Sequence, residues 1–509
     1  MLAPAGLSPD VSSSRPMLKK LVQRTLITLG VVVNLVFLGI NLRPDRPHLA
    51  RHRSFKLLLR ADPARAKWIE DNELGEFEAA NDVKLEVISV HSFEDVLDVL
   101  EAEKQKPTGL LLATIDSELS DELRGKGALR PIADGMAPLE LADAVEQYLP
   151  EAIAHSRGPD HKLWFIPRRA EVDVAVYLGP AVEDVYLHWE QDRGAITAAL
   201  AEVNRTGLPR DYAFEKDPNG WNSYDLFVAA WYWAHHPAPW SDAKNELAPR
   251  AALRTGDNDD ALHDLFSAFY RHGFTDADIG KTDVPAVIDA LQWEGLFRKH
   301  HLLAAACEAP DGIDSDGVNN LFKARKLAWI PINQEDSLWL HGGAQRGAER
   351  GITRAHELGW AMLPTGASLE LANGKPARIG RTFSVARIQL WAVPVHASDP
   401  KLAFALASFL TQRGLQQRET EAQGLLPIRQ DLRADYSILF RLSWMQRILA
   451  ASYHQLANGS GQLPPRVAAE ELDVLYQKLR ARVVYARPQV APVTFAAVQA
   501  AVQETTRGK

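Results

Sequence analysis

An alternation of strand-like and helix-like segments near the N-terminus constrains the fold most. Phe55–Arg60 is an apolar run typical of a buried strand, and residues 63–81 have helical spacing. Residues 83–90 alternate as a second strand, residues 93–106 are again helical, and Gly109–Thr114 is apolar throughout, as in a strand covered on both faces. This order predicts a parallel α/β sheet, where ligands usually bind beyond the carboxyl ends of the strands.

The length of the chain predicts more than one compact unit. At 509 residues it exceeds the usual size of a single hydrophobic core. The charged share of 24% and the net charge of -8 lack the basic excess of a nucleic-acid binder, so nucleic acid is not expected as a partner. The single cysteine, Cys307, forms no internal disulfide and has no zinc-site spacing, and we expect it to be a small buried residue.

The N-terminal segment predicts a membrane anchor. Residues 1–16 are rich in Pro, Ser and Ala and are expected to be disordered. Residues 17–44 combine positive residues with the apolar stretch Leu26–Leu42 and lack an Ala-x-Ala cleavage pattern. We therefore predict an uncleaved signal anchor that forms one transmembrane helix, with a removed signal peptide and a buried soluble helix as the alternatives. Residues 45–54 follow as a juxtamembrane linker, and positive residues on both sides leave the orientation open.

Several later segments occur in an order that resembles a known family. GLLLATID is followed by ELRGKGALRPI, then HKLWFIPRRAEVDVAVYLGPAV, LFKARKLAWIPI and LGWAMLPTG, and later DPKLAFALASFLTQRGLQQRETEAQGLLPIR. From Phe55 to the C-terminus this order resembles the extracellular solute-binding family of ABC transporters that includes the maltose-type sugar-binding proteins. Two positions depart from the family pattern. Arg325 replaces a customary glycine, and Thr494 stands near a customary aromatic residue, for which Phe495 substitutes only if the register differs by one.

The resemblance implies a periplasmic-binding-protein type II-like fold, with two α/β lobes joined by hinge crossovers near Pro167 and again before Trp391. The implied boundaries are residues 55–168 plus 385–432 for lobe 1 and residues 169–384 plus 433–509 for lobe 2. It further implies a protein of the bacterial cell envelope, anchored in the inner membrane with its globular part in the periplasm. Such a protein captures a sugar or oligosaccharide between its lobes and delivers it to ABC permease subunits, without catalysing a reaction.

Six residues are the candidates for ligand binding. The resemblance places the carboxylates of Glu171 and Asp116 and the aromatic ring of Trp339 at the cleft, with Trp339 in the loop after LAWIPI, and Trp391 is a further aromatic candidate. The neighbouring Arg168 and Arg169 suit an anionic ligand, which they would bind through fork-like hydrogen bonds. The alternatives are structural: Asp116 as a helix cap, and Glu171 as the partner of Arg168 or Arg169 at the surface.

Catalytic and metal-binding patterns are missing from the sequence. It has no GxSxG, HExxH, P-loop or GxGxxG motif, and we predict neither an enzyme nor a cofactor. His235-His236 and His300-His301 are read as solvated or capping residues, and Asp311–Asp316 as a turn that caps a helix at Val318 and binds no calcium. The alternative function is a membrane-tethered sensory or scaffold protein that keeps the solute-binding fold and signals to a partner membrane protein.

Overall fold

The fold is known from a computed structural model of the full chain. It describes residues 53–509 except 137–140, 143–144, 237–249, 253, 255–258, 280, 309–311, 342–353, 462–473, 475, 486–495, 497–498, 502 and 504–509. The chain divides into a small unit, Met1–Arg53 with Asp82–Lys84, and a large unit, Ser54–Asn81 with Leu85–Lys509. The large unit provides all residues of the smaller central sheet and, except for Arg53, Val83 and Lys84, all residues of the larger one.

The larger sheet has seven strands in the order β13-β12-β3-β1-β2, and β4 and β5 pair with β12. β1 and β3 are parallel, whereas β12 runs antiparallel to β3 and β5. The strands predicted in the first hundred residues are confirmed, and residues 57–59 in β1 are fully buried. The bounds are β1 (Arg53–Arg60), β2 (Val83–Val90), β3 (Leu110–Asp116), β4 (Leu129–Arg130), β5 (Phe165–Val172), β12 (Ser384–Pro394) and β13 (Ser460–Gly461).

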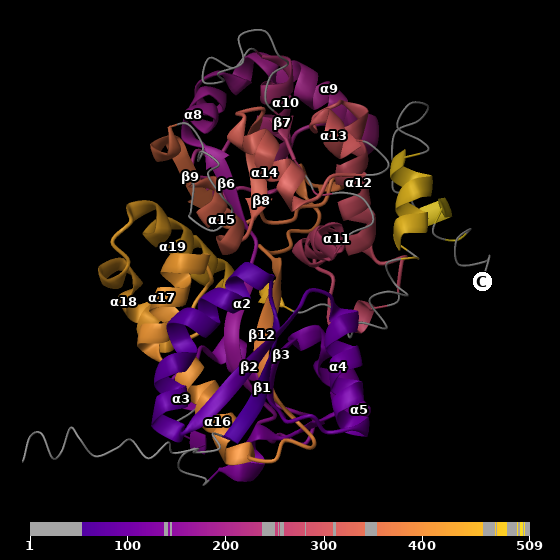
Figure 1. Ribbon diagram of the computed structural model, residues 1–509. Coiled ribbons are helices and arrows are strands. Elements are labelled where there is room, and N and C mark those ends of the chain that lie inside the picture. The colour runs from indigo at the N-terminus through magenta and orange to yellow at the C-terminus, as the bar shows by residue number, and fades with distance from the viewer. Residues whose placement is uncertain are drawn as a thin grey trace, which may run out of the picture. The chain divides into compact units, whose positions relative to one another are not determined.

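Helices pack around this sheet, and we call sheet and helices together lobe 1 (Figure 1). Asp62 caps the first helix by accepting a hydrogen bond from the Arg65 amide, and Ser92 and Asp95 form a capping box on α4. The helix predicted over residues 63–81 is interrupted by a π-helical turn, Glu70–Leu74. The helices are α2 (Pro63–Ile69), α3 (Gly75–Asn81), α4 (Phe93–Gln105), α5 (Ser120–Gly125), α7 (Pro150–Ala154), α16 (Pro400–Leu410), α17 (Arg413–Gln423) and α18 (Gln430–Leu439).

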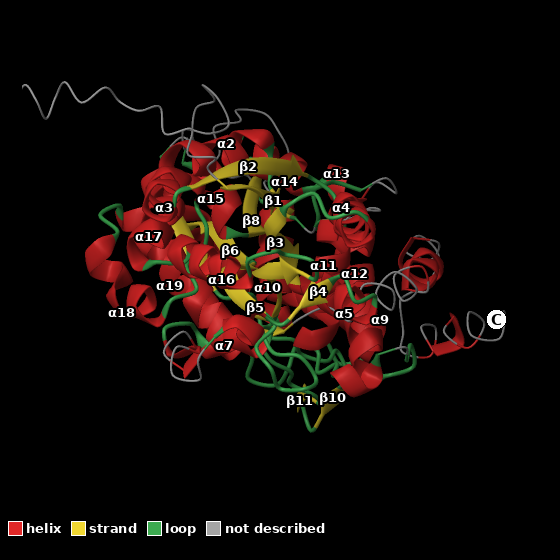
Figure 2. Ribbon diagram, turned by 60° about the horizontal axis from the view of Figure 1, so that its bottom comes forward, coloured by secondary structure: helices red, strands yellow, loops and turns green. Residues whose placement is uncertain are grey.

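The smaller sheet has four strands in the order β7-β8-β6-β9, and with its helices we call it lobe 2. Its strands are β6 (Val174–Leu178), β7 (Arg250–Ala251), β8 (Leu327–Ile332) and β9 (Leu358–Ala361). Its helices are α8 (Gly179–His188), α9 (Arg193–Asn204), α10 (Ser223–His235), α11 (Asp259–Arg271), α12 (Pro285–Lys299), α13 (Ala305–Glu308), α14 (Ser315–Lys323), α15 (Gln334–Leu340) and α19 (Ser443–Asn458). Strands β10 (Leu371–Ala372) and β11 (Lys375–Pro376) form a small separate hairpin, which lies away from the strands of the two central sheets (Figure 2).

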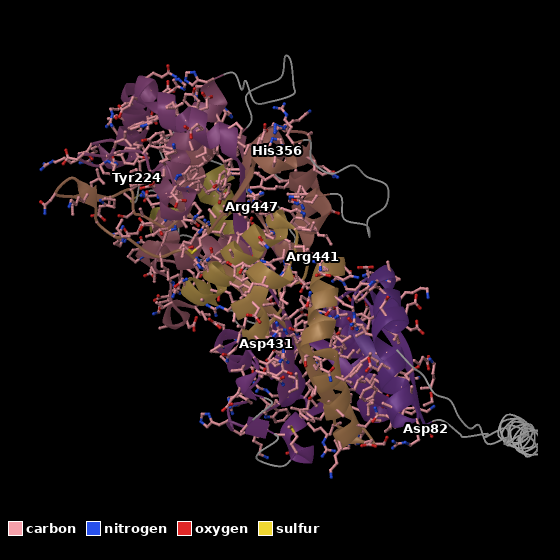
Figure 3. All side chains as sticks on the ribbon, turned by 90° about the vertical axis from the view of Figure 1, so that its left-hand side faces the viewer. Asp82, Tyr224, His356, Asp431, Arg441 and Arg447 are labelled. Carbon is pink, nitrogen blue, oxygen red and sulfur yellow. The ribbon has the colours of Figure 1, made fainter. Side chains whose placement is uncertain are left out.

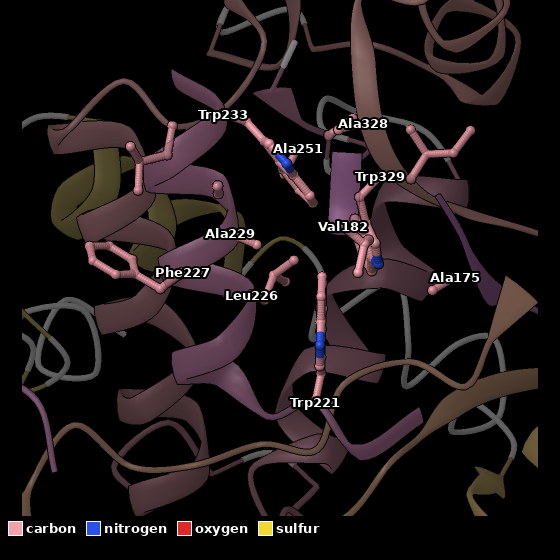
Figure 4. Packing of buried hydrophobic residues seen from close by; sticks show 14 of the residues in the cluster. Ala175, Val182, Trp221, Leu226, Phe227, Ala229, Trp233, Ala251, Ala328 and Trp329 are labelled. Carbon is pink, nitrogen blue, oxygen red and sulfur yellow. The ribbon is translucent and has the colours of Figure 1, made fainter. Parts of the chain in front are cut away.

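The core of lobe 2 is rich in aromatic residues. Helix α10 is buried along most of its length, and Trp221, Trp233 and Trp329 are almost completely buried in one cluster with it (Figure 4). Cys307 is buried in the same cluster, as predicted. Helix α19 covers the other side of the sheet, where Arg447 donates from Nη1 to the carbonyl oxygen of Leu358 on β9 at 3.1 Å (Figure 3).

The chain passes from the larger to the smaller sheet at Asp173, between β5 and β6. The expectation of a crossing at Pro167 is therefore corrected, because Pro167 lies inside β5 and pairs with Leu390 of β12. A β-bulge accommodates it: β5 gains one residue, Arg168, between the pairs Leu390–Pro167 and Gln389–Arg169. The chain returns between β9 and β12, so that two separate sheets are connected more than once, as a two-lobed fold requires.

The predicted signal anchor of residues 17–44 and the preceding residues 1–16 lie outside the described residues, and the linker overlaps them only at Arg53 and Ser54, which begin β1. Within the described part of the chain, no helix combines the length and the apolar character that crossing a membrane requires.

Candidate functional site

A cavity of about 370 Å³ lies between the two lobes. It opens where β1 and β2 end, which is the edge of the sheet that the sequence predicted for ligand binding. Lobe 1 contributes Arg60, Ala61, Asp62, Arg65, His91, Arg169, Glu171 and Arg387, and lobe 2 contributes Asp314, Ser315, Asp316, Asn333, Glu335 and Asp336.

Two neighbouring strands place the charged residues of the lobe 1 wall. Glu171 on β5 is paired in register with Arg387 on β12, and Arg169 lies two residues before Glu171 on the same strand. Arg169 Nη2 is 3.1 Å from Glu171 Oε1, and Arg387 Nε is 3.4 Å from Glu171 Oε2. Glu171 is therefore held between two guanidinium groups, one at each oxygen.

The two arginines keep Glu171 ionised. Burial by itself would raise the pKa of Glu171, but the charges of Arg169 and Arg387 outweigh burial and hold that pKa below its ordinary value. Burial lowers the pKa of Arg169 to about 10 against the opposing charge of Glu171, so that Arg169 remains a cation at neutral pH.

Glu335 of α15 connects the lobe 2 wall to lobe 1. Its Oε1 lies 2.5 Å from Arg65 Nη2 on α2, and its Oε2 lies 3.7 Å from Arg169 Nη1. The preceding residue of α15 also contacts lobe 1, since Gln334 Nε2 donates a hydrogen bond to the carbonyl oxygen of Val172 at 3.0 Å. The lobes thus meet through polar contacts at the edge of the cavity.

Asp116 lies at the end of β3, as predicted, but it does not line the cavity. Its carboxylate accepts a hydrogen bond from Arg60 Nη2 at 3.0 Å, and it makes no side-chain capping bond to the turn that follows. Asp116 therefore positions Arg60, which does line the cavity. The alternative of a helix cap is wrong, and a direct ligand contact of Asp116 stays a prediction.

Arg168 and Trp391 are packed away from the cavity. Arg168, the bulge residue of β5, binds Glu419 of α17 and Gln389 of β12, and its guanidinium lies 5.2 Å from the Trp391 ring centroid. Both side chains are almost fully buried and neither lines the cavity. The bulge directs Arg168 into the interior of lobe 1, so neither residue belongs to this cavity wall, and their ligand contacts stay a prediction.

Trp339 belongs to helix α15, not to a loop after β8, and its side chain lies outside the described residues. The predicted Thr494 and Phe495 also lie outside them. Among the described residues that line the cavity, none is a Trp, Tyr or Phe, and the imidazole of His91 is the only aromatic ring. The stacking platform expected for a sugar is therefore not found on the described walls.

Sequence reasoning missed Arg60, Arg65, Glu335 and Arg387. Arg60 is the last residue of β1, and the rule that ligands bind beyond the carboxyl ends of strands could have identified it. The other three reach the cavity through pairings between segments far apart in the chain, for which no local signal exists.

The acidic turn before α14 is a capping structure, as predicted. Asp314 Oδ1 accepts a hydrogen bond from the Gly317 amide at 2.8 Å and caps α14. Within the described ranges, no group of three or more His, Cys, Asp or Glu side chains is arranged to hold a metal ion.

Comparison with known proteins supports the fold independently. No protein-family model and no curated protein matches the sequence. Among solved structures, maltose-bound MalE3 of T. maritima has 15% sequence identity and a TM-score of 0.58, with 90% of this chain and 100% of that chain covered. The GacH receptor of Streptomyces glaucescens has 16% identity and a TM-score of 0.59, with 90% and 99% covered.

A third structure, the ABC transporter solute-binding protein of Thermotoga lettingae with alpha-D-tagatose bound, has 16% identity and a TM-score of 0.59, with 89% and 99% covered. The chain thus has the α/β fold of the maltose-type solute-binding proteins, the type II periplasmic-binding-protein fold. The names of the second and third of these structures describe a receptor and a solute-binding protein.

Proposed function

We propose that this chain is an extracytoplasmic solute-binding protein that captures a small solute, of the sugar class, between its lobes and delivers it to an ABC importer. The supporting observation is the cavity of about 370 Å³ whose walls come from both lobes. A solute that contacts both walls stabilises the closed arrangement, so that a permease can distinguish loaded from empty protein. The sugar class rests on the solved structures of the same fold, which were determined with maltose or tagatose.

The remaining parts of the proposal concern location and partners. The apolar segment within residues 17–44 would tether the protein to the inner membrane, with the lobes in the periplasm and ABC permease subunits as partners. Stimulation of a neighbouring importer's ATPase by the loaded protein would support delivery. Signalling through a membrane partner without transport would favour the sensory alternative.

Glu171 provides the test of the binding site. It lies between Arg169 and Arg387 at the cavity wall, so its replacement removes an ionised acceptor and disturbs both arginines. Glu171→Ala and Glu171→Gln should each weaken binding of the best solute roughly tenfold or more, because a hydrogen bond to a charged group contributes about 1.5–3 kcal/mol. The measurement is isothermal titration calorimetry on the full-length chain, after a screen of a sugar panel by thermal shift.

Glu190→Ala is the matched control, since Glu190 pairs with Arg193 on the exposed surface of lobe 2. It should leave the affinity unchanged. Wild-type affinity in both Glu171 variants would remove this cavity from the proposal.

A further inference from the structure

The two walls of the cavity differ in charge. Among the described lining residues, the lobe 1 wall has four arginines against two carboxylates, Asp62 and Glu171, whereas the lobe 2 wall has four carboxylates. No Trp, Tyr or Phe among these residues is present to stack on a pyranose ring. We propose that the solute carries an anionic group, a carboxylate or a phosphate, which binds at Arg169 and Arg387, while hydroxyl groups of the same solute face the carboxylates of lobe 2. This inference rests on the proposed function and specifies its ligand.

Arg169 has one donor that makes no hydrogen bond in the described part of the chain. Its side chain is only 7% exposed, its Nε donates to Gln389 Oε1 at 3.2 Å, and its Nη2 pairs with Glu171. Its Nη1 is buried from solvent, and its ion-pair partner Glu335 Oε2 lies at 3.7 Å, which is too distant for a hydrogen bond. A buried unsatisfied donor is costly, and Nη1 would gain a partner if an anionic oxygen of the solute displaced Glu335 from it.

The charges around Arg169 are of both signs. Burial lowers its pKa to about 10, the charges of Glu171 and Glu335 oppose this, and the charges of Arg65 and Arg168 act in the same direction as burial. Glu171 offers one oxygen to Arg169 and the other to Arg387, so that a single carboxylate serves two guanidinium groups on this wall. An arginine beside Glu171 would donate two parallel hydrogen bonds from its planar guanidinium group to a carboxylate or phosphate of the solute, because this group matches the geometry of both anions.

The carboxylates of the lobe 2 wall would orient the bound solute. Asp314, Asp316 and Asp336 line it, and their carboxylates repel an anion but accept hydrogen bonds from hydroxyl groups. The anionic end of the solute is therefore placed on lobe 1 and its hydroxylated end on lobe 2. A cavity of about 370 Å³ lies within the roughly 300–1,000 Å³ typical of small-molecule sites and has room for one acidic sugar.

The experiment compares matched solutes on the full-length chain by isothermal titration calorimetry. The pairs are glucuronate with glucose and galacturonate with galactose, and glucose 6-phosphate and glucosamine extend the set. We expect at least one acidic sugar to bind tenfold or more tightly than its neutral counterpart. The carboxylate and phosphate arms separate the two kinds of anion.

Arg169→Gln and Arg387→Gln should each reduce the affinity for the acidic sugar tenfold or more and remove its preference over the neutral sugar. Arg169→Lys, which keeps the charge but loses the fork, should give an intermediate loss. Arg193→Gln on the surface is the control. Thermal melting without solute verifies that each variant is folded, and the second arginine tests the inference if the first variant is not.

Equal affinity for neutral and acidic sugars would overturn the inference and leave the proposed function intact. Tighter binding of glucosamine would also overturn it, in favour of a cationic solute on the lobe 2 wall. If no acidic solute binds, the inference fails, whereas the proposed function fails only if no solute of the wider sugar panel binds.

Discussion

At the scale of single residues, Glu73 is an acid of lobe 1 whose pKa is strongly raised. It lies in the π-helical turn of residues 70–74, is 4% exposed, and its Oε1 has no hydrogen-bond partner in the described part of the chain. Burial and the nearby charge of Glu419 raise its pKa to about 9, against the opposing charges of Arg168 and Arg418. Glu73 is therefore protonated at neutral pH in the folded protein.

This raised pKa makes the stability depend on pH. The neutral acid favours the folded state fully below about pH 4.5, the pKa of an unfolded Glu, and this contribution is lost as the pH rises toward 9. Glu73→Gln stays neutral at all pH values. We expect its free energy of unfolding to exceed that of the wild type by roughly 4–6 kcal/mol at pH 9 and by less than about 1 kcal/mol near pH 5.

Urea unfolding at pH 5, 7 and 9 measures the difference. Glu76→Gln, three residues further along at an exposed position, is the matched control and should follow the wild type at each pH. An excess stability that is the same at pH 5 and pH 9 would show that Glu73 does not change its protonation in this range.

At the scale of elements, strand β5 carries two adjacent arginines with different surroundings: Arg168 lies in the interior of lobe 1, and Arg169 lines the cavity. The bulge at Arg168 brings both arginines to Gln389 of β12, yet Arg168 continues to Glu419 of α17, whereas Arg169 reaches the cavity. The Gln416 side chain donates to the carbonyl oxygen of Arg168 at 2.8 Å and so satisfies the backbone of the bulge. Arg168 is therefore a structural residue of lobe 1.

Replacement of Arg168 should destabilise the fold more than it affects binding. Arg168→Gln leaves the buried Glu419 without its cation, and the loss of one partner from a buried ion pair costs about 3–5 kcal/mol. We expect a loss of that size in urea unfolding, with solute affinity within about twofold of the wild type in the folded protein. Arg169→Gln should give the opposite result, a smaller loss of stability and a larger loss of affinity.

The same strand shows how far sequence reasoning reaches. The apolar and alternating patterns predicted β1, β2 and β3 with good bounds, because each pattern is local. Pro167 was interpreted as the crossing between lobes because proline disrupts a central ladder, but the bulge at Arg168 removes the disruption and the crossing follows at Asp173. Whether Arg168 or Arg169 faces the cavity depends on that bulge, and no composition or spacing encodes it.

At the scale of the whole molecule, the two lobes were predictable and the chemistry between them was not. The order of the segments indicates two sheets, whereas the walls of the cavity combine residues from α2, β5, α15 and β12, which are spread from Pro63 to Pro394 along the chain. The family resemblance predicts Glu171 at the cavity, where the structure places it. Its partner Arg387 required the register of β5 on β12, which is a long-range property of the folded chain.

The ion pairs of Glu335 connect the lobes, and we expect them to bias the hinge. Glu335 reaches Arg65 and Arg169 of lobe 1 from α15 of lobe 2, and its side chain is 24% exposed, so that solvent only partly screens it. Glu335→Gln keeps the shape of the side chain but removes this attraction between the lobes. The solute-free variant should therefore have a larger radius of gyration by small-angle X-ray scattering than the solute-free wild type, and saturating solute should restore the smaller value.

Raising the salt concentration from 0.05 to 0.5 M, values chosen to shorten the Debye length from about 14 to 4 Å, should shift the radius of gyration of the wild type toward that of the variant. Glu421→Gln, on an exposed position of α17, is the control. An identical radius for Glu335→Gln and wild type without solute would mean that these ion pairs do not influence closure.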